Sequence, residues 1–295
     1  HPQEDYFNMY RIDDKSDLKE AVLYVDYKTN IREHNMAAAG REAGCGFSKS
    51  FVESFLCSDG LPISLSNKYL GDETMRKETA NRDPRLKQLI LTNDFPTNVT
   101  DDLKDSTFVV NEDEFITQHC FTGYRPIKGF NPIYSQALYM KSSFDGIAYR
   151  YAETLLINAE AKAELNTITN ADLDRTVNQL RDRVGMPHLT VNVGFTDPKW
   201  PDWGYSLSPV LQEIRRERCI ELAGEGFRFN DLKRWKAGKL LNNVLTYVGK
   251  RKPDGNLAIV YPNYTNPDLS YQAGKSRTWE DKMYLYPIPT GELQR

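Results

Sequence analysis

The sequence has few of the residues that usually build metal centres. Its 295 residues include only four cysteines and four histidines, and no two cysteines have the CxxC spacing that is typical of zinc sites. We therefore expect no metal and no cofactor. We expect the four thiols to be free and buried, where cysteine packs as a small hydrophobic residue; they are Cys45, Cys57, Cys120 and Cys219.

Long apolar runs, a strong net charge and the common catalytic motifs are also missing. No apolar run approaches the ~18 residues of a membrane-spanning helix. The 38 basic and 41 acidic residues leave a net charge of -3, so the chain has no general attraction to nucleic acid. Without a GxSxG elbow, a glycine-rich phosphate loop or an HExxH motif, the sequence indicates no enzyme class.

The clearest local pattern is a helical hairpin at 147–185. Apolar residues, four of them alanine, recur from Ala148 to Ala163 on one face of a long helix, so a second helix can approach closely. That second helix should begin at an Asn170 cap and end at Gly185. A single hairpin cannot bury both of its faces, so we expect it to pack on other parts of the protein.

Outside the hairpin the sequence predicts loops and short strands. Residues 16–28 fit a helix and a strand equally well. The segment 31–47 should be a long loop, and 61–64, after the SDG turn, a short extended piece. Residues 81–91 should lead into another short strand, and 92–134 should be irregular chain. The predicted fold is therefore mainly α, with irregular loops and a few short strands.

A second helical unit is predicted at 208–237, where basic and acidic side chains alternate. Ser208 and Pro209 form a start signal for a helix whose apolar stripe contains Arg218. A short helix should follow, with Phe229, Leu232 and Trp235 on its buried face. Because the charges alternate in sign, they argue against a site for nucleic acid.

A buried arginine needs carboxylate partners for its donors. The candidates for Arg218 on the predicted helices are Glu153, Glu160, Glu221 and Glu225. We interpret these groups as structural ion pairs that join the hairpin to the 208–237 unit. The alternative is an acid and base pair for catalysis, which would require a cleft.

Four segments, taken in order, resemble the SusD/RagB family of outer-membrane nutrient-binding lipoproteins. They are IAYRYAETLLINAEAKAELN at 147–166, QLRDRVGMP at 179–187, LQEIRRERCIELAGEGFRFNDLKRWKAG at 211–238 and YLYPIP at 284–289. The resemblance implies a tetratricopeptide-type helical hairpin and a loop-rich C-terminal module. It also implies that 1–295 matches the C-terminal region, with the N-terminal helical-repeat half and the lipid anchor outside this chain, as in a fragment or a processed product.

The same resemblance implies a function at the surface of the cell outer membrane of Bacteroidetes. Proteins of this family capture oligosaccharides for a TonB-dependent, SusC-like transporter, as part of polysaccharide utilization, and they are not enzymes. Two alternatives stay open. This part could instead be a docking half whose ligand is a peptide or another nutrient, and a glycoside hydrolase is the more remote alternative.

Sugar binding requires flat aromatic faces and planar polar groups, usually on loops. Three segments offer them: 199–205, the region from 261 to 279, and 31–47. The candidate ligand residues are Trp200, Trp203, Tyr205, Tyr264, Trp279, His34, Asn35 and Arg41. The alternative is that these aromatic rings pack in the interior, where Trp and Tyr are common anchors.

Overall fold

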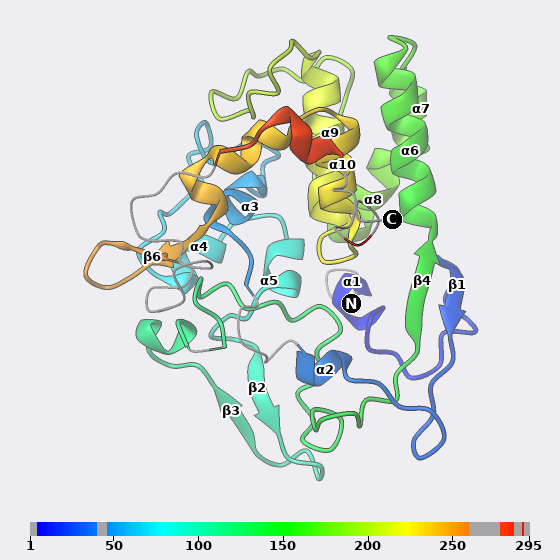
Figure 1. Cartoon of the computed structure of the whole chain (residues 1–295), viewed down its shortest axis with the longest axis vertical. Coiled ribbons are helices and arrows are strands. Elements are labelled where there is room, and N and C mark those ends of the chain that lie inside the picture. Colours follow the sequence, from blue (N-terminus) through cyan, green and yellow to red (C-terminus); the bar gives the residue numbers. More distant parts are fainter. Residues whose placement is uncertain (1–4, 40–45, 118, 260–277, 286–290, 292–295) are drawn as a thin grey trace.

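Helices and loops build most of the chain. The computed structural model describes residues 5–39, 46–117, 119–259, 278–285 and 291. The longer helices gather on one side, and short helices, small hairpins and loops fill the other (Figure 1). Each described sheet has only two strands, so the predicted fold class is confirmed. No helix in these ranges is long and apolar enough to cross a membrane.

Helices occupy most of the predicted hairpin. Helix α6 runs Tyr151–Glu164, α7 Asn170–Asp174 and α8 Val177–Val184. The predicted cap is off by one residue, because the Thr169 side chain accepts the bond from Asp172 N and Asn170 is already helical. Gly185 ends α8 in the left-handed conformation at φ 69°, as predicted, since glycine has no Cβ to oppose it.

The start of the hairpin is extended chain, which the periodicity missed. Residues Gly146–Arg150 form strand β4, which pairs antiparallel with β1 at Ala21–Val25. The strand interpretation of 16–28 is therefore the correct one. Ala148 belongs to this strand because the backbone pairing, and not the helical spacing of its side chain, fixes its conformation.

Helix α9 begins as predicted and packs on α6. It spans Pro209–Glu221, and the Ser208 side chain accepts from Leu211 N. The alanines of α6 contribute to a shared apolar cluster with α9 and α8. Their small side chains let the helices approach closely. Helix α10 follows at Phe227–Arg234, but Phe229, predicted to be buried, is 48% exposed.

The remaining elements are short. They are α1 Asp5–Asn8, α2 Met36–Ala39, α3 Lys49–Ser54, α4 Met75–Thr79, α5 Arg85–Leu89, β2 Pro96–Val99, β3 Ser106–Phe108, β5 Val248–Arg251, β6 Leu257–Ile259 and the 3-10 turns η1 Glu112–Phe115, η2 Gly238–Asn242, η3 Val244–Thr246 and η4 Asp281–Tyr284. The predicted extended piece at 61–64 forms no strand. The short strand predicted after 81–91 corresponds to β2, which forms a hairpin with β3 inside the segment 92–134 that was predicted to be irregular. Cys57 and Cys120 are buried free thiols as predicted, Cys219 is half-buried and free, and Cys45 lies outside the described residues.

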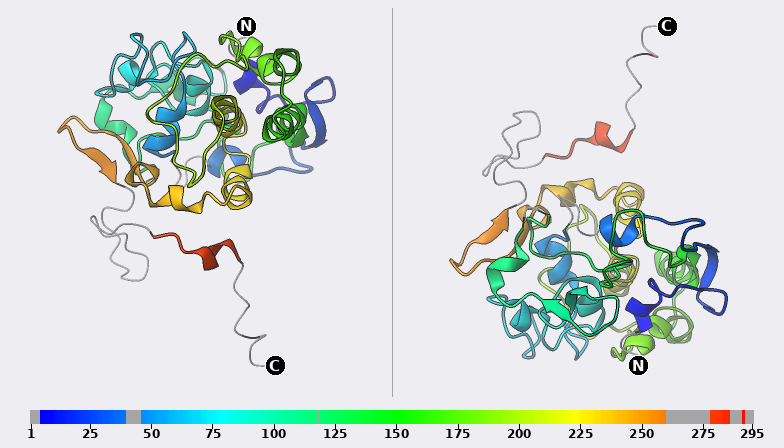
Figure 2. Two further views of the ribbon diagram at one scale, coloured as in Figure 1. Left: turned by 90° about the horizontal axis from the view of Figure 1, so that it is seen from above. Right: turned by 90° about the horizontal axis from the view of Figure 1, so that it is seen from below.

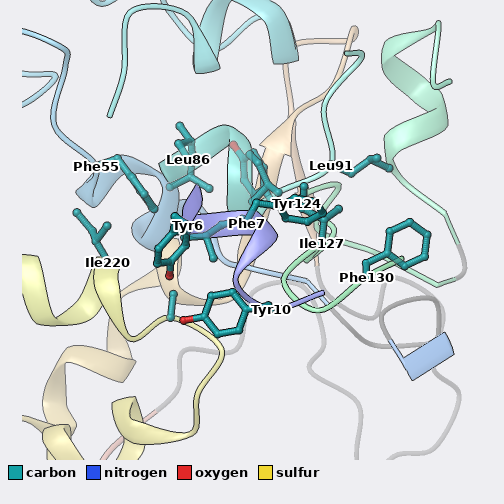
Figure 3. Packing of buried hydrophobic residues seen from close by; sticks show 14 of the residues in the cluster. Tyr6, Phe7, Tyr10, Phe55, Leu86, Leu91, Tyr124, Ile127, Phe130 and Ile220 are labelled. Carbon is teal, nitrogen blue, oxygen red and sulfur yellow. The ribbon is translucent and has the colours of Figure 1, made fainter. Parts of the chain in front are cut away.

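The main apolar core joins segments that are far apart in sequence. Tyr6 and Phe7 of α1 lie among side chains of α3, α5 and the 124–130 loop (Figure 3), and Ile220 of α9 closes this cluster. Viewed from above and below, α1 lies against the α8 and α9 side, while η4 lies outside the main body (Figure 2). The Tyr6 hydroxyl donates to the Glu221 carbonyl at 2.8 Å, so the core ends at a polar junction.

That junction is a network of buried charges around Glu221, whose side chain is 0% exposed. Its carboxylate lies 2.8 Å from Arg85 Nη1 of α5, 2.6 Å from Arg150 Nη1 of β4 and 2.5 Å from Arg183 Nη2 of α8. Burial alone would raise the pKa of Glu221, but the three guanidinium groups outweigh it and hold the pKa well below its usual value. One carboxylate therefore joins three elements to α9.

Glu221→Gln should destabilise the fold by about 3–5 kcal/mol, because it removes the one buried charge that three guanidinium groups share, although each arginine keeps another carboxylate partner. The free energy of unfolding in urea measures this loss. Glu73→Gln is the matched control, since Glu73 is exposed and, among the described residues, forms an ion pair with Lys77 alone. Equal stability of the two variants would contradict the role given to Glu221.

Acid should also weaken the fold. The pKa values of Glu217, Glu221 and Glu225 are lowered by neighbouring cations despite burial, so below about pH 4.3 the unfolded chain binds more protons than the folded one. The stabilisation is complete above that pH and is lost as pH falls through the folded pKa values. The free energy of unfolding in urea, measured from about pH 5 to pH 3, should show this loss, and it should fall less steeply with pH in Glu221→Gln than in the native chain. The same pH dependence in both proteins would contradict the role given to Glu221.

Candidate functional site

Trp200 is half-buried and held at both of its ends. Its Nε1 donates to Glu213 Oε1 at 2.7 Å, and its ring lies 6.1 Å from the Phe195 ring. A cavity of about 140 Å³ adjoins this point, between the 59–61 turn, the 187–195 loop and Glu213. Trp200 thus stands beside a small polar cavity, and its place as a ligand residue stays a prediction.

Trp203 lies in the interior, which makes it a poor sugar platform. Its ring is 6% exposed and meets Trp235 edge-on at 5.4 Å. The Arg215 guanidinium lies 4.8 Å from the ring centre, and Nε1 donates to Gln212 at 2.6 Å. Trp235 and Arg215 therefore already contact the ring, and Gln212 already accepts the hydrogen bond from its N–H. Sequence could not show this because the loop that carries Trp203 folds over α10.

Tyr205 follows on the same loop and is 44% exposed. Its hydroxyl donates to the Trp235 carbonyl at 2.7 Å and accepts from Arg215 Nη1 at 3.0 Å. The hydroxyl is therefore used internally, while part of the ring remains open to solvent.

Of the three candidate ligand residues in the 31–47 loop, two make hydrogen bonds within the protein and the third lies outside the described residues. His34 is half-buried, with Nε2 donating to the Phe144 carbonyl at 2.8 Å and Nδ1 accepting from Met36 N at 3.1 Å, and burial lowers its pKa. Asn35 accepts from Met140 N at 3.0 Å. Arg41 lies outside the described residues. His34 and Asn35 thus fasten this loop to the 138–144 segment.

Two exposed aromatic side chains at 134–139 were not predicted as ligand residues from the sequence. Tyr139 is 74% exposed and Tyr134 is 53% exposed. Tyr134 ends the segment predicted to be irregular and Tyr139 lies just beyond it, where no periodicity distinguishes an exposed ring from a buried one. They form a second surface on which a ligand could stack.

Trp279 packs on α10 and its 3-10 extension η2. Its ring contacts Phe229 at 6.4 Å and Tyr284 at 5.1 Å between centroids. A Cβ on Gly238 would lie 2.0 Å from the indole, so the close approach requires glycine at that position. The Tyr284 hydroxyl accepts from Gly238 N at 2.9 Å. We call the rings of Phe229, Trp279 and Tyr284 the aromatic ridge. Tyr264 lies outside the described residues.

Arg218 is buried as predicted, at 5% exposed, but its predicted partners are wrong. Its Nε lies 2.9 Å from Asp231 Oδ2 of α10, because the turn after α9 folds α10 back against it. Glu160 instead pairs with Arg234, Glu221 with the three arginines described above, and Glu225 with Lys128 and Arg150. Glu153 has no ion pair with any described residue.

The buried carboxylates of this region are held by cations. Burial raises the pKa of Glu225, but Lys128 and Arg150 outweigh it, so the pKa is lowered. Burial lowers the pKa of Lys128 to about 8 despite its contact with Glu225. These groups stabilise the fold, and within the described ranges no group of three or more His, Cys, Asp or Glu is placed to hold a metal ion.

Comparison with known proteins identifies related chains. A family model described as the SusD family matches residues 12–295. The SusD-like protein P2 of Formosa agariphila is 32% identical over 155 residues, which are 52% of this chain and 25% of that protein.

Two solved structures share the fold. A SusD-like protein of Bacteroides fragilis has a TM-score of 0.68 and 25% identity, over 99% of this chain and 55% of its own. A SusD-like carbohydrate binding protein of the same species has a TM-score of 0.63 and 22% identity, over 99% of this chain and 61% of its own. The chain thus spans a quarter of the curated relative and little more than half of these structures.

The Arg218 and Asp231 pair should respond unequally to substitution. Arg218→Leu leaves Asp231 with its second partner, Arg234, at 2.9 Å, whereas Asp231→Asn leaves the buried guanidinium with no charged partner among the described residues. We expect Asp231→Asn to be the more destabilising change, by about 3–5 kcal/mol relative to the native chain. Thermal unfolding of both variants measures the difference. Two small, equal effects would show that the pair contributes little.

Proposed function

Since this chain belongs to the SusD family, as its sequence motifs indicate, we propose that it binds oligosaccharides at the cell surface and delivers them to a SusC-like, TonB-dependent outer-membrane transporter. Support comes from the fold that it shares with a SusD-like carbohydrate binding protein of Bacteroides fragilis. The proposed location is the outer membrane, with a lipid anchor and an N-terminal helical-repeat half supplied by sequence outside residues 1–295.

The observation that carries the proposal is the aromatic ridge on α10. Aromatic faces stack against the C–H face of a sugar ring, and Phe229 is 48% exposed. Trp279 and Tyr284 continue the ridge from a separate segment that packs on α10 and η2. Tyr205, whose hydroxyl bonds to the Trp235 carbonyl at the end of α10, stands by the same helix. Rigid rings brought together from distant segments suit the capture of an extended glycan.

We propose binding without catalysis. Three of the four candidate acidic residues, Glu160, Glu221 and Glu225, are held in ion pairs. Glu221 is 0% exposed and is matched by three arginines, so it stays ionised and has no access to a substrate. A glycosidase needs two carboxyl groups on either side of a bound sugar, which the surroundings of Glu221 do not provide.

A docking function is the second candidate, and the loop surface at 134–140 favours it. Tyr134, Leu138, Tyr139 and Met140 are 41–74% exposed there. Clustered apolar side chains on a surface often mark protein contacts. In that case the aromatic ridge and the loop surface would serve different partners.

Variants of the two surfaces separate these functions. Phe229→Ala and Trp279→Ala should each weaken glycan binding about five- to tenfold, since a stacked ring contributes about 1 kcal/mol or more. Affinity electrophoresis against a panel of plant, host and microbial polysaccharides identifies a ligand, and calorimetry then measures its affinity.

Tyr139→Ala is the matched control, because it removes a ring that is 74% exposed and distant in sequence from α10. It should leave glycan affinity unchanged. Loss of affinity in Tyr139→Ala, with the ridge variants unaffected, would move the glycan site to the loop surface. Circular dichroism confirms that each variant is folded.

A further inference from the structure

The basic side chains of α9 and those that follow α10 differ in whether they form ion pairs. The arginines of α9 are paired: Arg215 with Glu164, Arg216 with Asp197 and Arg218 with Asp231, at 2.6–2.9 Å. Lys236 and Lys239, which follow α10, are exposed, and neither has an ion pair among the described residues. Carboxylates therefore neutralise these arginines of α9, whereas the positive charges of the two lysines that follow α10 have no such partners among the described residues.

These lysines lie beside the aromatic ridge. The Lys236 ammonium is 5.2 Å from the centre of the Tyr284 ring. Within α10, Lys233 lies one turn after Phe229 on the same helix face, and its ammonium is 5.6 Å from the centre of the Phe229 ring. Lys239 follows Gly238, the residue on which Trp279 packs. Ammonium groups thus lie close to the Phe229 and Tyr284 rings of the ridge.

Acidic groups near the ridge are mostly neutralised. Glu280 pairs with Lys282 at 2.6 Å. Asp231 and Glu160 both pair with arginines, including Arg234. Asp281 remains as an exposed carboxylate. The surface therefore carries a local excess of positive charge on a chain whose net charge is -3.

We infer that the aromatic ridge with Lys236 and Lys239 is a binding site for acidic polysaccharides, whose sugars carry carboxylate or sulfate groups. This inference rests on the proposed carbohydrate binding and specifies the class of ligand. A ring face takes the C–H side of the sugar, and an ammonium at its edge takes the anionic substituent by a charge-assisted hydrogen bond.

The layout favours this class over other polyanions. The overall charge of the chain is negative, so long-range attraction does not gather a polyphosphate. Lys236 and Lys239 therefore act at short range, on anionic groups of a ligand that is already close to the rings. A sugar with one anionic group per residue or per few residues matches that alternation of ring and ammonium.

Dextran and dextran sulfate provide a test, because they share one backbone and differ in sulfate. Carboxymethyl cellulose and hydroxyethyl cellulose form the corresponding pair for carboxylate. In affinity electrophoresis the native chain should be retarded more by the charged member of at least one pair. Lys236→Gln with Lys239→Gln should weaken that binding about tenfold or more, as expected when two charge-assisted contacts are lost.

The control replaces Lys19 and Lys68, two exposed lysines away from the ridge, by glutamine. It should bind the charged polymer as the native chain does. Equal losses in both double variants, or no preference for a charged polymer, would overturn the inference. If the native chain shows no preference for a charged polymer but binds a neutral glycan, and Phe229→Ala weakens that binding, the proposed function stands while the inference fails.

Vesicles with and without phosphatidylserine distinguish an anionic lipid surface from an acidic glycan. Phosphatidylserine-dependent binding that is lost in the Lys236 and Lys239 variant, without retardation by either charged polymer, would assign the surface to lipid and overturn the inference. Retardation by charged polymers with no binding to vesicles supports it.

Discussion

The carboxylate of Glu221 is the point on which the rest of the structure depends. It lies in the interior against guanidinium groups from α5, β4 and α8. A charge removed from water is tolerated only when its partners are in place. Each of these elements is too short or too irregular to fix its own position, so the polar junction sets how they meet. The apolar core around Tyr6 packs directly against this junction.

Sequence reasoning succeeded where local chemistry decides the outcome. The Ser208 cap, the glycine stop after α8 and the alanine face of α6 follow from neighbouring residues alone, and all three are present. It failed where the partner is distant. Arg218 was correctly placed inside, but its partner is Asp231, because a turn whose geometry the periodicity does not encode brings α10 against α9.

The candidate ligand residues show the same division. Composition and loop signals found aromatic side chains, yet they could not say which faces remain open. Trp203 is enclosed by Trp235 and Arg215, whereas Phe229, expected in the core, is half-exposed. Burial of a ring in irregular chain depends on tertiary packing, and only the fold reveals it. The ridge on α10 is a property of two segments that the sequence separates by about fifty positions.

The bond between Tyr6 and Glu221 spans 215 residues of sequence, and this has a consequence for synthesis on the ribosome. Helix α1 is synthesised well before α9, so the α9 groups that cover it are made much later. Until α9 is made, the Tyr6 hydroxyl lacks its native acceptor, and Arg85, Arg150 and Arg183 each lack one of their carboxylate partners. Contacts of such long range slow folding and leave apolar surface exposed. We therefore expect α1 to complete its native packing only after α9 has been synthesised.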